Sequence, residues 1–125
     1  GRSVPFPFPI RVINLLLSTD VWAGALIRRA ELGGAFAAVA HKGDERAGGV
    51  LLKVFDTTMR RARIYTEAFG PDGERLWIQP VESDQGADID AYAARQRQYD
   101  PALWIIEIED REGRHFLVEK VAGEG

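Results

Sequence analysis

Acidic residues near the carboxyl-terminal end of the chain are the first candidates for chemistry. Glu107 and Glu109 lie two residues apart, so in a strand their side chains point to the same side. With Asp110 they form an acidic cluster, and paired carboxylates can carry general acid–base chemistry or bind a hard cation. The same spacing is typical of a solvent-exposed strand face, because the apolar Ile106 and Ile108 would then face the interior. We therefore interpret the pair as surface residues and predict neither a metal site nor a cofactor.

His115 joins this cluster if the chain turns back after Asp110. In that hairpin His115 would lie across from Glu109 as a Glu–His pair. A slip of one residue in the register would place the two side chains on opposite faces. We interpret the pair as a cross-strand surface contact, and we keep as an alternative an enzyme that uses Glu107, Glu109 and His115.

Arg29 is the second candidate, since it falls among the apolar positions of a predicted helix. An unpaired charge is very costly to bury, so its guanidinium must pair with a carboxylate, cap backbone carbonyls or hold an anion. We expect an internal ion pair with Glu107 or Glu109. The alternative is a binding site for a small anionic ligand, in which Arg95 supplies a second positive charge.

The motifs of several enzyme classes are missing from the sequence. There are no cysteines, which excludes thiol catalysis, zinc–thiolate sites and disulfides, and which suits a reducing compartment such as the cytoplasm. The glycine pattern of a phosphate-binding loop is absent, and so is the G-x-S-x-G turn of many serine hydrolases. Nucleophilic catalysis therefore has no support in the sequence.

The balance of charges limits the partners. The 125 residues include 16 basic and 19 acidic side chains, which gives a net charge of −3. Because affinity for nucleic acid comes from clustered Lys and Arg, we expect no general nucleic-acid binding. The apolar runs are shorter than the roughly 18 residues of a transmembrane helix, so no membrane partner is expected.

Capping and turn signals divide the chain into two helices and a set of strands. One helix follows the capping residues at 18–20 and runs to about Leu32, and a second spans about 88–99. Four strand-like segments between them, at 35–41, 49–55, 61–69 and 75–81, are joined by short turns, which predicts an antiparallel meander. Leu103–Glu109 is the clearest strand, and His115–Val118 is expected to return as its hairpin partner.

The domain boundaries follow from composition. Residues 1–17 are expected to form an extended Pro-rich arm, because three prolines alternate with Val4, Phe6 and Phe8. This arm is either a simple extension or a segment that docks on a partner. Residues 18–119 are expected to form the single folded domain, and residues 120–125 a tail.

Three strings of residues carry a likeness to a known family. They are Trp22-x-x-Ala25-x-x-Arg28-Arg29, then Gly43-Asp44 with Ala47-Gly48, and the long string Asp100-Pro101-x-Leu103-Trp104-x-x-Glu107-x-Glu109-Asp110-Arg111-x-Gly113-Arg114-x-Phe116-Leu117. Over residues 20–117 the chain resembles a bacterial family filed as domain-of-unknown-function family 1491. The resemblance implies a cytoplasmic bacterial protein of unknown role, and it supplies no catalytic residues.

The sequence thus predicts an α+β fold, in which one antiparallel sheet of five or six strands carries both helices. The apolar face of the first helix should comprise Val21, Trp22, Ala25, Leu26, Ala30 and Leu32. The core should include Trp22, Leu26, Val39, Leu51, Ile64, Trp77, Tyr92, Trp104, Ile106 and Phe116. For function we expect a non-catalytic interaction or regulatory module. Its partner would be another protein, a small anionic ligand or a second copy of the chain.

Overall fold

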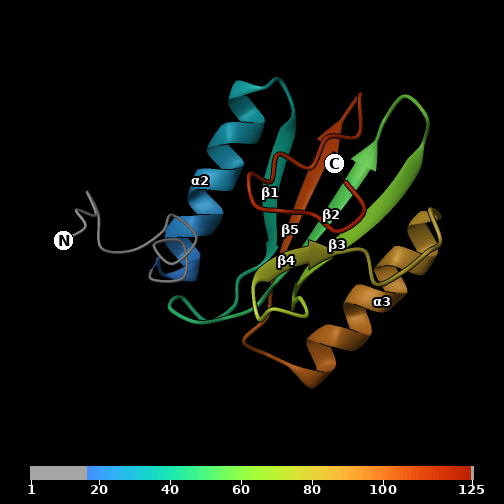
Figure 1. Ribbon diagram of the computed structural model, residues 1–125. Helices are drawn as coiled ribbons and strands as arrows, with labels where there is room; N and C mark the ends of the chain where they lie inside the picture. Colours follow the sequence, from blue (N-terminus) through green and yellow to red (C-terminus); the bar gives the residue numbers. More distant parts are fainter. Residues whose placement is uncertain (1–16, 125) are drawn as a thin grey trace.

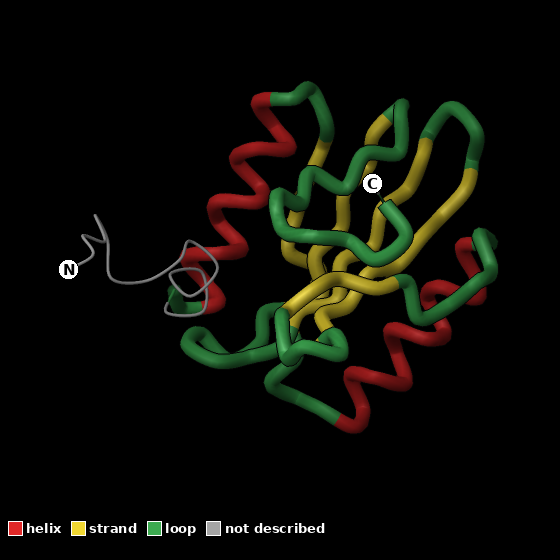
Figure 2. Tube along the Cα trace, in the orientation of Figure 1, coloured by secondary structure: helices red, strands yellow, loops and turns green. Residues whose placement is uncertain are grey.

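The structure is a computed structural model that describes residues 17–124, and these residues form two helices and five strands (Figures 1 and 2). In chain order the elements are α2 (Thr19–Leu32), β1 (Phe36–His41), β2 (Val50–Asp56), β3 (Arg61–Phe69), β4 (Arg75–Ile78), α3 (Gly86–Tyr99) and β5 (Trp104–Asp110). Both predicted helices are present. The predicted Pro-rich arm lies almost wholly outside the described residues.

The five strands form one sheet in the order β1-β5-β2-β3-β4. The α+β class is therefore confirmed, but the expectation of a purely antiparallel sheet is wrong, because β2 and β5 are parallel. The predicted four-strand meander is also wrong at its first step: β5 lies between β1 and β2, and only β2, β3 and β4 follow one another. The chain reaches this central place from β4 through α3, so the connection between the two parallel strands comprises β3, β4 and α3.

The predicted C-terminal hairpin does not form. Residues 115–118 are not a strand, because the backbone leaves the extended region at Gly113 and Phe116, whose φ angles are +69° and +61°. The chain instead crosses the sheet, and Val121 forms a parallel bridge with Trp77 of β4. The Trp77 amide donates to the Lys120 carbonyl at 2.8 Å. Val121 is buried, within the segment that the sequence analysis set apart as a tail.

The sheet has a layer on each face (Figure 1). Buried side chains of α2 and of the C-terminal segment, such as Leu26 and Leu117, pack with Leu52 on one face. On the other face Ile89 of α3 packs with Leu51. Neighbouring residues of one strand thus enter different cores, as side chains that alternate along a strand must. We call these the α2 face and the α3 face.

Most of the predicted core is buried. The buried members are Leu26, Leu51, Ile64, Trp77, Trp104 and Ile106, whereas Trp22, Tyr92 and Phe116 are partly buried against the core clusters. Val39 is an exception, with 39% of its surface exposed. It belongs to β1, which among the described residues is an edge strand with a neighbour on one side.

The predicted apolar face of α2 is only half correct. The residues that α2 buries are Ala23, Leu26 and Ala30, whereas Val21 and Leu32 of the predicted face are exposed. Among the strands, α2 packs mainly on β1. This single strand covers a smaller part of the helix circumference than the apolar side chains of α2 occupy. The helix therefore carries apolar side chains on its solvent side as well.

Candidate functional site

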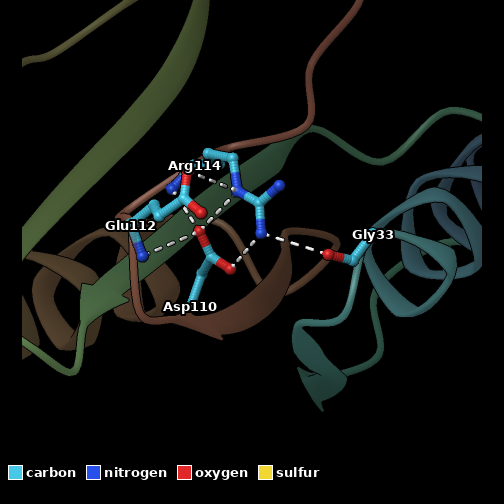
Figure 3. Close-up of polar contacts among 4 residues, drawn as sticks. All are labelled: Gly33, Asp110, Glu112 and Arg114. Atoms are coloured by element: carbon cyan, nitrogen blue, oxygen red, sulfur yellow. Dashed lines mark hydrogen bonds and ion pairs between the residues drawn. The ribbon is translucent and has the colours of Figure 1, made fainter.

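Asp110 ends β5 with its side chain on the α2 face, where only 2% of its surface is exposed. The Arg114 guanidinium binds both carboxylate oxygens, through Nε to Oδ2 at 2.9 Å and through Nη2 to Oδ1 at 2.8 Å (Figure 3). The backbone amides of Glu112 and Arg114 donate to Oδ2 as well. These hydrogen bonds lower the pKa of Asp110 to about 2, and the hydrogen bond from the Arg114 side chain contributes most. The burial of the Asp110 carboxylate acts in the opposite direction. Asp110 is therefore a tightly held structural carboxylate.

Arg114 also ties this loop to α2. Its Nη2 donates to the Gly33 carbonyl at 3.1 Å, at the end of the helix where unpaired carbonyls attract a positive charge (Figure 3). Its guanidinium carbon lies 4.9 Å from the centroid of the Phe116 ring. Residues 110–114, a part of the long string that carries the family likeness, thus form a clasp between β5 and α2.

Arg29 lies beside this clasp and binds a carbonyl rather than a carboxylate. Its Nε donates to the Phe116 carbonyl at 3.1 Å. Its Nη2 is buried and has no hydrogen-bond partner among the described residues. The expected partners Glu107 and Glu109 belong to the other face of the sheet. The structure thus shows one of the three possibilities that the sequence leaves open, the capping of a carbonyl, for Nε alone.

Glu107 and Glu109 do share one face of β5, the α3 face. Glu107 accepts a hydrogen bond from Lys53 Nζ at 2.9 Å, and the same ammonium lies 2.7 Å from Asp90 of α3. Burial alone would lower the pKa of Lys53, but its hydrogen bonds to Asp90 and Glu107 outweigh that effect and raise it. Glu107 is thus partly neutralised by the ammonium that links the sheet to α3.

Glu109 differs from Glu107 in its exposure and, among the described residues, in its lack of an ion pair. It is exposed, and no ion pair to it is present within residues 17–124. In the sheet it is paired with Phe36 of β1 on one side and with Phe55 of β2 on the other. An unneutralised carboxylate therefore lies between two aromatic side chains, one strand in from the edge of the sheet.

His115 is not part of this acidic face. Its ring stands edge-on to Tyr65, with 5.1 Å between centroids, and Tyr65 belongs to the core cluster of the α2 face. Its Nε2 lies 3.0 Å from Glu124 Oε1, and its Nδ1 accepts the Leu117 amide. The sheet therefore separates His115 from Glu107 and Glu109, so these three residues do not form one site.

Arg95 is likewise apart from Arg29. Arg95 is exposed on α3, whereas Arg29 belongs to α2 on the opposite face of the sheet. The two guanidinium groups therefore do not converge on one anion. Within residues 17–124 no group of three His, Asp or Glu side chains is arranged to hold a metal ion. In the same range no helix is long and apolar enough to cross a membrane.

The free edge of β1 is the feature that the sequence analysis missed. Within residues 17–124 strand β1 pairs with β5 only, and its sequence F-A-A-V-A-H carries no Lys, Arg, Asp or Glu. Phe36 is 63% exposed. The opposite edge, β4, is partly closed by hydrogen bonds from Trp77 to Lys120 and from Ala122 back to Trp77. The absence of charged residues over 35–40 is the signal in the sequence that could have indicated this edge.

Protein edges of this kind are usually blunted by charges, prolines or bulges, because unpaired backbone groups recruit other strands. In β1 the only such device is an irregularity in the pairing between Val39 and His41. The segment before it, Phe36–Val39, is regularly paired with β5 and has no charge. The open edge of β1 and the adjoining surface of Phe36, Glu109 and Phe55 form what we call the edge site.

Comparison with known proteins places this architecture in a family. The family model described as "Protein of unknown function (DUF1491)" matches residues 17–118. A search of curated proteins finds no match.

Solved structures agree with the family match. A crystal structure of a DUF1491 family protein from Caulobacter crescentus CB15 is 61% identical, covers 85% of this chain and 99% of its own, and superposes with a TM-score of 0.83. An NMR structure of a DUF1491 family protein from the same organism is 60% identical over 86% of this chain and 98% of its own, with a TM-score of 0.81. The solution structure of protein Atu0922 from A. tumefaciens is 28% identical over 88% of this chain and 99% of its own, with a TM-score of 0.70.

Proposed function

This chain belongs to the DUF1491 family, and from its surface we propose that it is a non-catalytic interaction module of the bacterial cytoplasm. Its partner is another protein, which contributes an extended segment as an additional strand along the free edge of β1. The observation that carries this proposal is the combination of an open edge and an uncharged strand, in which Phe36 and Val39 are exposed on opposite faces.

Strand addition suits this edge for a physical reason. About half of the N–H and C=O groups of an edge strand point away from the sheet, and a partner strand pairs with them at about 0.5–1.5 kcal/mol net per hydrogen bond. Side chains on alternate positions of the added strand then meet Phe36 on the α3 face and Val39 on the α2 face. Backbone pairing supplies affinity, and these side-chain contacts supply selectivity.

The catalytic alternative receives no support from the geometry. Glu107 and Glu109 lie on the α3 face, and His115 lies against Tyr65 on the α2 face. A nucleophile, a base and an oxyanion site must lie within a few ångströms of one another to act together. We therefore propose binding rather than chemistry as the role of this domain.

The test is a selection of peptides followed by mapping of the contact. A displayed library of random nine-residue peptides is selected on the full chain, and the enriched peptides are titrated into isotope-labelled protein. We expect the amide resonances of β1 to shift. We also expect Phe36→Lys to abolish binding, whereas Phe69→Lys, a change at a still more exposed phenylalanine at the end of β3, leaves it intact. Peptides that bind elsewhere, or no enriched peptides at all, would contradict the proposal.

A second function is favoured by one specific observation, the buried Nη2 of Arg29 that has no hydrogen-bond partner among the described residues. A small oxyanion is a natural partner for such a donor. Titration with inorganic phosphate and with sulfate tests this function: saturable shifts of residues around Arg29 that disappear in Arg29→Gln would support it. Loss of the folded state in Arg29→Gln, without any anion effect on the wild type, would leave Arg29 a structural residue.

A further inference from the structure

The α3 face of the sheet is covered unevenly. Helix α3 packs on β3 and β2, and its link to the sheet runs through Lys53 to Asp90. Towards β1 this face remains open: Phe36 is 63% exposed and Glu109 is exposed as well. A strand added to β1 would therefore have its own α3-face side chains next to an uncovered surface.

The charge on this open surface is negative and unevenly neutralised. Glu107 is paired with Lys53 at 2.9 Å, but Glu109 has no ion pair within residues 17–124. Strand β1 supplies no basic side chain between Glu109 and the edge. A partner that docks here must either leave this carboxylate desolvated at the rim of the contact or bring a positive charge to it.

From this charge and its neighbours we infer that the partner segment carries an arginine on its α3-facing side, whose guanidinium binds Glu109 and lies against the Phe36 ring. The inference rests on the proposed edge-strand function and names the chemistry of its partner. The segment is thus extended, mostly apolar and basic at one position.

The reach of the side chains fits this arrangement. Adjacent strands are about 4.8 Å apart, so the added strand would lie two spacings, or roughly 10 Å, from β5. A long side chain of the added strand and that of Glu109 can span this separation by extending towards each other. Ala38, the next residue of β1 on the same face, is small and leaves the space beside Phe36 open.

The aromatic neighbours favour arginine over lysine. Phe36 and Phe55 flank Glu109 in the register of the sheet. A guanidinium is planar, binds a carboxylate through two parallel hydrogen bonds and stacks on an aromatic ring at the same time. A lysine ammonium is more strongly hydrated and makes no bidentate pair, so it would gain less here.

The same charges argue against a second copy of the chain as the partner. Pairing of β1 with the β1 strand of another copy would bring no arginine or lysine to Glu109, because F-A-A-V-A-H contains none. It would bring a second Glu109 to the same ribbon, and the net charge of −3 adds to the repulsion. The edge site is complementary to a basic partner, and not to itself.

The same selection of random nine-residue peptides, carried out at low ionic strength, tests this inference. We expect arginine to be enriched at one position among binders of the wild type. This enrichment should be lost on Glu109→Gln and retained on the matched variant Glu82→Gln, which changes an exposed glutamate in the loop before α3. Replacing that arginine of the best peptide by glutamine should weaken binding about tenfold.

The outcomes separate the two proposals. Peptides that shift β1 resonances but show no arginine preference, or that bind Glu109→Gln as well as the wild type, would overturn the arginine inference while the edge-strand function stands. An absence of any β1-directed peptide would overturn both. Sedimentation that shows a dimer, abolished by Ala38→Lys, would identify a second copy as the occupant and overturn the inference. A charge swap adds a positive check: Glu109→Arg should bind the peptide whose arginine is replaced by glutamate.

Discussion

Glu109 and Asp110 are consecutive residues of β5, yet their carboxylates belong to opposite faces of the sheet and have opposite roles. Asp110 is 2% exposed and is bound by two nitrogens of Arg114. Glu109 is exposed and lies between Phe36 and Phe55. Because successive side chains of a strand point to opposite faces, one of these two neighbouring acidic residues is structural and the other lies on the surface.

We expect Asp110→Asn to lower the free energy of unfolding by about 3 kcal/mol, because the change leaves the Arg114 guanidinium without its charged partner. In either orientation the new amide nitrogen would also face a donor, which is the backbone amides of Glu112 and Arg114 at the Oδ2 position or Arg114 Nη2 at the Oδ1 position. Urea unfolding followed by circular dichroism measures the effect. As a control, Glu112→Gln should change stability by less than about 0.5 kcal/mol, because Glu112 Oε1 is 3.9 Å from Arg114 Nε and the side chain is exposed.

The same carboxylate predicts a dependence of stability on pH. The pKa of Asp110 falls from the ordinary 3.8 to about 2 in the folded state, so the folded state binds its proton more weakly than the unfolded state does. The stabilisation is complete above pH 3.8 and is lost as the pH falls through 2. It amounts to about 2 kcal/mol. Unfolding measured between pH 2 and pH 5 should show this loss in the wild type and a shallower slope in Asp110→Asn.

The elements of the fold were predictable because each has local signals, but the neighbours of β5 were not. The segment 103–109 was clearly a strand, whereas its pairing depends on contacts distant in sequence. One signal was available: Trp104, Ile105, Ile106 and Ile108 are all buried, and apolar residues on both sides indicate a central strand. An edge hairpin strand would need only one apolar side.

The candidate site was predictable only in part, and for a related reason. The shared side of Glu107 and Glu109 follows from the period of a strand and is confirmed. The partner of Arg29 was not predictable, because it is the carbonyl of Phe116, a residue with a φ angle of +61° that sequence patterns do not indicate. The edge site was missed because the place of β1 in the sheet depends on where β5 inserts.

Two glycine substitutions should have opposite effects on stability. Gly113 has a φ angle of +69°, and a Cβ there would lie 2.9 Å from Asp56 Oδ2, so Gly113→Ala should destabilise the protein by about 1–2 kcal/mol. Gly24 lies within α2, and a Cβ there would meet no atom within 4 Å. Gly24→Ala should therefore stabilise by about 0.5–1 kcal/mol. Thermal unfolding of each variant measures the change in stability. Two changes of the same sign would contradict the assigned backbone conformations.

Lys53 should contribute to stability through charge rather than through packing. Its ammonium lies 2.7 Å from Asp90 and 2.9 Å from Glu107 and joins α3 to the sheet. We expect Lys53→Met, which keeps the apolar stem, to lower the free energy of unfolding by about 1 kcal/mol in dilute buffer, and we expect the difference to shrink in 1 M salt, where the Debye length is about 3 Å.

The direction of the pKa shift gives a second check on Lys53. Its pKa is raised above the ordinary 10.5 in the folded state, so the stabilisation is complete below pH 10.5 and is lost as the pH rises through the higher folded-state value. The wild type and Lys53→Met should therefore converge in stability at strongly alkaline pH. If the wild type and Lys53→Met are equally stable in dilute buffer at neutral pH, the charge of Lys53 contributes nothing, and α3 is held on the sheet by apolar contacts such as those of Ile89.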